Sequence, residues 1–153
     1  MDDRFHSAGE GRISLQLDPA ESAFLADMVR MLETVGEIEG DPAEKRLNVP
    51  AYLGDAEAAA EWRRLVGDQI EDGRARDREV LRAVVEDEGT VDLDPDRAEA
   101  ILRTVNEARL VLAARLGIEV ESDYEQLDAG GTVALHYLGL FIEDLTDELS
   151  RML

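Results

Sequence analysis

The sequence contains no cysteine. Disulfide bonds, thiolate nucleophiles and thiolate metal ligands are therefore excluded, because each of them needs a cysteine side chain. Lysine is almost as rare, since Lys45 is the single lysine and the other basic residues are arginines. Aromatic residues make up only 5% of the chain, so its core has to be built mainly from aliphatic side chains.

Long hydrophobic runs are also missing. No apolar stretch approaches the roughly 20 residues that a membrane-spanning helix needs, and the opening MDDRFHSAGEG lacks the basic region and apolar core of a signal peptide. We therefore expect a cytoplasmic protein without a membrane segment. At 153 residues, 44% of them hydrophobic, the chain is suited to one domain with a core. We predict a single helical domain over residues 1–153.

The charge is strongly one-sided. The chain has 36 acidic residues against 16 basic residues, which gives a formal net charge of -20. A field of this sign repels phosphate backbones and anionic lipid surfaces. Direct binding of nucleic acid or of a membrane is therefore disfavoured, and a protein with a basic surface is the favoured partner.

The segment from Leu93 to Leu116 shows the clearest helical pattern. Asp94 followed by Pro95 is typical of a helix N-cap and first helical position. The apolar residues that follow recur at three- and four-residue spacing, as on one face of a helix. They are Ala98, Ile101, Leu102, Val105, Ala108, Leu112 and Leu116. We expect this helix, residues 94–116, to be the central element of the fold.

The remaining pattern predicts a mainly α fold. Helical spacing also begins at Asp18, at Asp55 and at Thr132, and Gly73 leaves open whether residues 55–87 form one helix or two. Residues 37–54 are expected to be a loop. Residues 4–17 alternate around a glycine-rich turn, which predicts a β-hairpin, and Val91 with Leu93 is suited to a third strand. We predict a compact bundle of four to five helices with a small N-terminal β-hairpin or three-stranded sheet.

Motifs that carry chemistry are missing. Asp92, Asp94 and Asp96 resemble the start of a calcium loop, but its sixth and twelfth positions hold Arg97 and Arg103 instead of glycine and glutamate. Two isolated histidines without thiols do not make a zinc site, and no serine lies in a nucleophile elbow. We therefore predict no catalytic residue, metal ligand or cofactor site, and a protein that is not an enzyme.

Two polar features near helix faces are candidates for a role. Arg74, Arg78 and Arg82 share one face at four-residue spacing and form a possible interaction face, although neighbouring acids favour a solvated face with local ion pairs. Asn106 and Arg109 adjoin the buried stripe of the central helix. A partly buried guanidinium needs a carboxylate partner, and the last helix supplies candidates. We predict a structural polar network of Asn106, Arg109, Asp144 and Asp147.

The last helix is the most apolar segment of the chain. Its hydrophobic character exceeds what a surface helix usually carries, so we expect it to extend into a homodimer interface. The residues of this possible dimer helix are Leu138, Phe141, Ile142 and Leu145.

Three segments together resemble a known family. They are the alternating strand and capped helix of residues 13–35, Val91-Asp92-Leu93 with the VNEARL segment of residues 105–110, and the HYLGL segment of residues 136–140. The chain is similar to the actinobacterial domain-of-unknown-function family encoded beside the ClpS protease adaptor, which includes an oxidative-stress transcriptional regulator. The resemblance implies a cytoplasmic, non-enzymatic protein in transcriptional or stress control, with a sigma factor or other transcription component as partner. The thiol sensing of that regulator has no counterpart in a chain without cysteine.

Two functional hypotheses follow. The first is an acidic interaction module, a cytoplasmic regulatory protein that acts through protein–protein contacts. The alternative is a winged-helix-like DNA-binding regulator that uses the arginine-lined helix face. Titration against random duplex DNA at low salt separates them, because only the alternative predicts tight and salt-sensitive binding.

Overall fold

A computed structural model describes residues 4–47, 54–87 and 89–152. It confirms the predicted fold class, a mainly α structure with a small three-stranded sheet. The elements in chain order are β1 (Phe5–Gly9), β2 (Arg12–Gln16), α1 (Pro19–Glu33), α2 (Pro42–Leu47), α3 (Ala56–Glu86), β3 (Thr90–Leu93), α4 (Pro95–Arg115), the 3-10 helix η1 (Glu121–Gln126) and α5 (Ala129–Arg151).

The sheet has the order β1-β2-β3, and both strand pairs are antiparallel. The turn between β1 and β2 needs left-handed backbone conformations, and Gly9 and Gly11 supply them with φ angles of 73° and 72°. In the second pair Ile13 lies opposite Leu93, and both side chains are fully buried. The third strand is therefore the one that the alternating pattern predicts.

Local capping explains where the helices begin. Asp18 accepts a hydrogen bond from the backbone of Glu21, whose side chain in turn accepts one from the Asp18 backbone, which completes a capping box ahead of α1. Asp94 caps α4 with a single bond of this kind, which its side chain accepts from the backbone N–H of Arg97. The chain thus uses the same unit of structure twice, a strand followed by an Asp-Pro helix start, at β2–α1 and at β3–α4.

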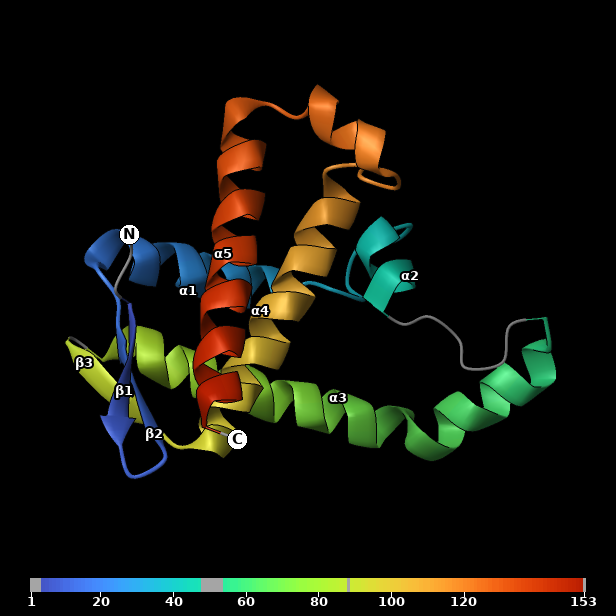
Figure 1. Cartoon of the computed structure of the whole chain (residues 1–153). Helices are drawn as coiled ribbons and strands as arrows, with labels where there is room; N and C mark the ends of the chain where they lie inside the picture. The colour runs from blue at the N-terminus through green and yellow to red at the C-terminus, as the bar shows by residue number, and fades with distance from the viewer. Residues whose placement is uncertain (1–3, 48–53, 88, 153) are drawn as a thin grey trace.

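Helix α4 is central to the packing, as its pattern predicts. It lies beside α5, and α1 and α3 cross this pair, with the sheet at one end (Figure 1). The core is formed mostly by buried aliphatic side chains from the four long helices and the sheet, together with Phe5 and Phe141. Those that are fully buried include Ile13, Leu15, Leu25, Leu93, Ile101, Val105, Leu138, Phe141 and Leu145.

Two segments differ from or sharpen the predictions. Residues 56–86 form one continuous helix, α3, because glycine inside a helix costs only about 1 kcal/mol relative to alanine and Gly73 does not end it. Within residues 37–54, which the sequence predicts to be a loop, Pro42–Leu47 form the short helix α2. The preceding Asp41 is buried and binds the guanidinium of Arg115 at 2.7 Å, which attaches α2 to the end of α4.

Candidate functional site

The predicted network around Arg109 does not form in the part of the chain that the structure describes. Asn106 and Arg109 are both exposed, and so is Asp147. The remaining member, Asp144, instead accepts a hydrogen bond from Arg4 at 2.9 Å. This prediction was wrong because Arg109 lies about 100° around the helix from the buried Ala108. That rotation leaves the residue exposed, with its guanidinium lying over Gly139 of α5 and away from the acidic side chains.

The predicted arginine face is turned toward neighbouring helices. Arg74 lies 3.3 Å from Glu107 of α4 and donates a hydrogen bond to the Leu47 carbonyl at 3.0 Å. Arg82 pairs with Glu33 of α1 and with Glu79 of its own helix. The side chain of Arg78 is only 13% exposed and binds Glu71 at 3.0 Å. These guanidinium groups therefore contribute to the packing of α3 and do not form the open basic surface that DNA binding needs.

The predicted dimer residues belong to the core of the single chain. Leu138, Phe141 and Leu145 are fully buried, and Ile142 packs against the same cluster. Their apolar area is already covered within the chain, chiefly by α4 and β1, so the prediction that they present a dimer surface was wrong. The last helix is apolar because it is a central helix with several neighbours.

A charged cluster that the sequence did not indicate lies where β1, α1 and α5 meet. We call it the Arg4 corner and define it as Arg4, Glu21, Tyr137 and Asp144. The Arg4 side chain is 3% exposed, and its Nε and Nη1 donate to Glu21 and Asp144, both at 2.9 Å. A buried guanidinium is stable only when it is fully partnered, and here two carboxylates supply the opposite charge.

Aromatic rings complete the Arg4 corner. The Arg4 guanidinium carbon lies 5.1 Å from the centroid of the Tyr137 ring and 6.0 Å from that of Phe141, within cation–π range. Phe5 contacts Phe141 edge-on at 5.0 Å, and Phe24 contacts Tyr137 edge-on at 5.2 Å. The corner therefore joins the first strand, the first helix and the last helix into one unit.

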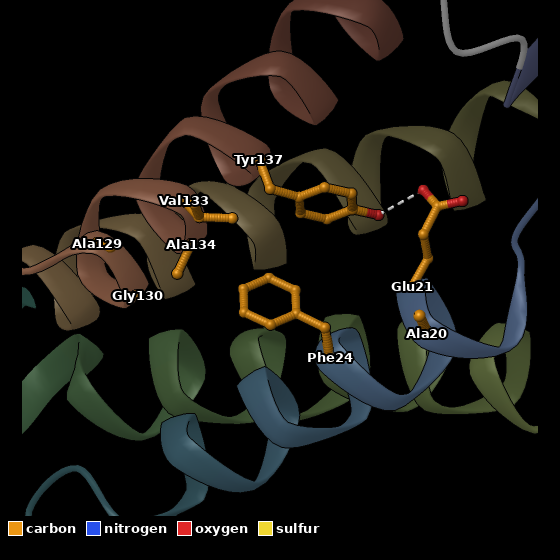
Figure 2. A pocket seen from close by; sticks show the side chains of 8 residues that line it. All are labelled: Ala20, Glu21, Phe24, Ala129, Gly130, Val133, Ala134 and Tyr137. Atoms are coloured by element: carbon orange, nitrogen blue, oxygen red, sulfur yellow. Dashed lines mark hydrogen bonds between the residues drawn. The ribbon is translucent and has the colours of Figure 1, made fainter.

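The Tyr137 hydroxyl faces the same carboxylate. It donates a hydrogen bond of 2.8 Å to Glu21, on the oxygen that also accepts from Arg4 (Figure 2). Burial and this bond to a carboxylate raise the pKa of Tyr137 far above its usual value. The phenol therefore stays protonated and remains a donor at any physiological pH.

An apolar groove opens beside the corner, between the first turns of α1 and the first turns of α5 (Figure 2). Its volume is about 560 Å³. The lining residues are Ala20, Glu21, Phe24, Ala129, Gly130, Val133, Ala134 and Tyr137. Their only polar side chains are those of Glu21 and Tyr137, which bind each other, so the groove offers a hydrophobic surface. Val133, in the groove wall on α5, is 67% exposed.

The last part of the chain, which includes the α5 wall of the groove, carries almost entirely one sign of charge. No lysine or arginine occurs between Arg115 and Arg151, a stretch that includes η1 and almost all of α5. Nine carboxylates lie in this stretch: Glu119, Glu121, Asp123, Glu125, Asp128, Glu143, Asp144, Asp147 and Glu148. Asp18, at the start of the opposite wall, is exposed as well. Asp18 and Asp128, the exposed caps of α1 and α5, thus place carboxylates beside an apolar lining.

A comparison with protein-family models gives one match. The family described as "Domain of unknown function (DUF2017)" matches residues 2–151. The chain belongs to the DUF2017 family. The predicted membership of a domain-of-unknown-function family is confirmed in this form. The comparisons found no matching curated protein and no matching solved structure.

Beyond the groove, the part of this DUF2017 domain that the structure describes has a second pocket but no metal-ligand group and no helix that could span a membrane. A second, smaller pocket of about 370 Å³ lies between α3, β3 and the start of α4, and charged side chains of Glu79, Asp87 and Arg97 form part of its wall. In the described ranges no group of three or more metal-ligating side chains comes together. Within the same ranges no helix is both long enough and apolar enough to cross a bilayer.

No short-range signal in the sequence pointed to the Arg4 corner. Arg4 and Glu21 are 17 residues apart, and Arg4 and Asp144 are 140 residues apart. The sequence did assign Glu21 a role, in the capping box of α1, and the structure adds a second one. Only the tertiary fold places the N-terminal arginine against the last helix.

Proposed function

We propose that this DUF2017 domain is a non-enzymatic, cytoplasmic regulatory protein that acts through protein–protein contacts. The α1–α5 groove is its contact surface. The observation that carries the proposal is the groove itself, an apolar surface with Val133 mostly exposed in its wall. An apolar groove between helices is a surface on which proteins commonly bind apolar side chains of a partner.

The regulatory part of the proposal rests on family resemblance. The resemblance to a family that includes a stress-response regulator suggests a place in transcription or stress control, with a transcription component as partner. The absence of a nucleophile motif and of cysteine in the sequence supports a role without catalysis. The DNA-binding alternative receives no support from the groove, and its arginine face is engaged with α1 and α4.

Site-specific photo-crosslinking tests this proposal. A benzophenone amino acid is placed at Val133, and a control protein carries it at Leu65 on α3. The two side chains are matched in exposure, at 67% and 66%. We expect covalent adducts with a cellular protein in the native cytoplasm from position 133 and not from position 65. Absence of adducts at 133, or equal labelling at both positions, contradicts the proposal.

A further inference from the structure

We infer that the occupant of the α1–α5 groove is an amphipathic helix of another protein, with aliphatic or aromatic residues on one face and lysine or arginine beside them. This inference rests on the proposed function and names the chemistry of its partner.

The walls of the groove favour a helix over an extended strand. All eight lining residues come from the two helices α1 and α5, and none comes from a strand. An extended peptide in this groove finds no sheet edge with which to pair its backbone N–H and C=O groups, and unpaired buried groups of this kind are costly. A helix satisfies its own backbone, so it can enter an apolar groove with side chains alone.

The lining also determines which side chains enter. Glu21 and Tyr137 already bind each other at 2.8 Å, and Glu21 in addition accepts from Arg4. A polar group inserted among the apolar side chains of Phe24, Val133 and Ala134 lacks a free partner and loses its hydration. The anchoring face of the occupant is therefore apolar, with side chains about three and four residues apart.

The charge around the groove determines the charge of the occupant. The exposed caps Asp18 and Asp128 lie at the starts of α1 and α5, next to lining residues, and the stretch 116–150 carries nine carboxylates and no lysine or arginine. Lysine or arginine beside the apolar face of the occupant is attracted by these carboxylates, whereas carboxylates of the occupant are repelled. A second copy of this chain, with its own net charge of -20, or an anionic membrane meets the same repulsion. A basic partner fits and these two do not.

Three synthetic peptides of about 18 residues, or five helical turns, test the inference. The first is an amphipathic leucine–lysine helix, the second replaces every lysine by glutamate, and the third is the first with its sequence scrambled. Binding to the full chain is measured by fluorescence anisotropy at an ionic strength of about 0.15 M. We expect the first peptide to bind at least about tenfold more tightly than the other two.

Two substitutions locate the binding. Val133→Asp and Leu65→Asp each add one negative charge at a mostly exposed position, so attraction of a cationic peptide rises equally in both. We expect only Val133→Asp to weaken binding of the first peptide, by about tenfold. Ala20→Phe fills the groove without changing the charge and is expected to weaken binding similarly. Circular dichroism verifies that all three variants are folded.

The outcomes separate the inference from the proposed function. Equal binding of the glutamate peptide or of the scrambled peptide overturns the inference, as does equal binding to the Val133→Asp and Leu65→Asp variants. If the peptides fail while crosslinking at position 133 captures a protein, the groove is a contact surface for a different kind of occupant and only the inference falls. If crosslinking at 133 fails as well, both fall.

Discussion

Two of the buried charges in this molecule differ in how well they are partnered. In the Arg4 corner a cation with 3% of its side chain exposed is bound by two carboxylates and faces two aromatic rings. Between α3 and α4 an anion, Glu107, has 16% of its side chain exposed and lies 3.3 Å from Arg74. That arginine also donates to the Leu47 carbonyl. Burial raises the pKa of Glu107, although Arg74 and Arg78 lower it.

The difference shows that burying a charge stabilises a fold only where its partners outweigh the lost hydration. Arg4 has more opposite charge around it than it carries, and it connects the strand and the two helices that form the groove. The charged form of Glu107 is less stable in the fold than in water, as the raised pKa of this side chain indicates. We therefore expect the Arg4 corner to be a structural anchor and Glu107 to be replaceable.

The largest effect is expected at Arg4. Arg4→Ala leaves Glu21 and Asp144 near each other without their shared cation, and we expect the free energy of unfolding to fall by about 3 kcal/mol. Urea denaturation measures the loss. The matched control is Arg109→Ala on α4, which removes an exposed guanidinium and should change stability by no more than about 0.5 kcal/mol. Similar losses in both variants would show that Arg4 is not an anchor.

A smaller effect is expected at the tyrosine of the same corner. Tyr137→Phe removes one hydrogen bond to Glu21 and keeps the ring that faces Arg4 and Phe24. We expect a loss of about 1–2 kcal/mol in the free energy of unfolding, since the acceptor is a carboxylate. The apolar wall of the groove remains, so binding of the leucine–lysine peptide should be unchanged. A loss of peptide binding without a loss of stability would assign the hydroxyl to the groove and not to the corner.

The smallest effect, and one of opposite sign, is expected at Glu107. Its pKa is raised in the fold, so the carboxylate costs stability at neutral pH, and this cost is relieved as the pH falls through the folded pKa. We expect Glu107→Gln to be as stable as the parent protein at pH 7 or more stable by up to about 1 kcal/mol. The difference should shrink toward about pH 4. Urea titrations at both pH values test this, and a clear destabilisation at pH 7 would refute it.

Most of the fold follows from local features of the sequence. Asp18-Pro19 and Asp94-Pro95 start α1 and α4 because a side-chain carboxylate and a fixed proline φ act on their own helix. The hairpin likewise depends on its turn residues and on alternation within one strand. The short α2 was missed because six residues carry little periodicity, and it is attached through Asp41 to Arg115, far away in sequence.

The candidate site could not be predicted in the same way. The sequence singled out Arg109 because it adjoins an apolar stripe, but periodicity does not determine whether a side chain at the stripe's edge lies in a helix interface or in solvent. The residues that bury charge in its place are separated by up to 140 positions. The apolar residues of the last helix were assigned to a dimer, since their pattern does not reveal how many neighbours within the chain cover them.

The sequence by itself determined the helical class, the three strands, the main helix starts and the one-sided charge, because each depends on neighbouring residues or on composition. The tertiary structure alone decided which arginine is buried and where an apolar surface stays open. The reason is physical: burial is a property of all the elements that pack around a side chain. For Arg4, Glu21, Tyr137 and Asp144 those elements are the first strand, the first helix and the last helix of the chain.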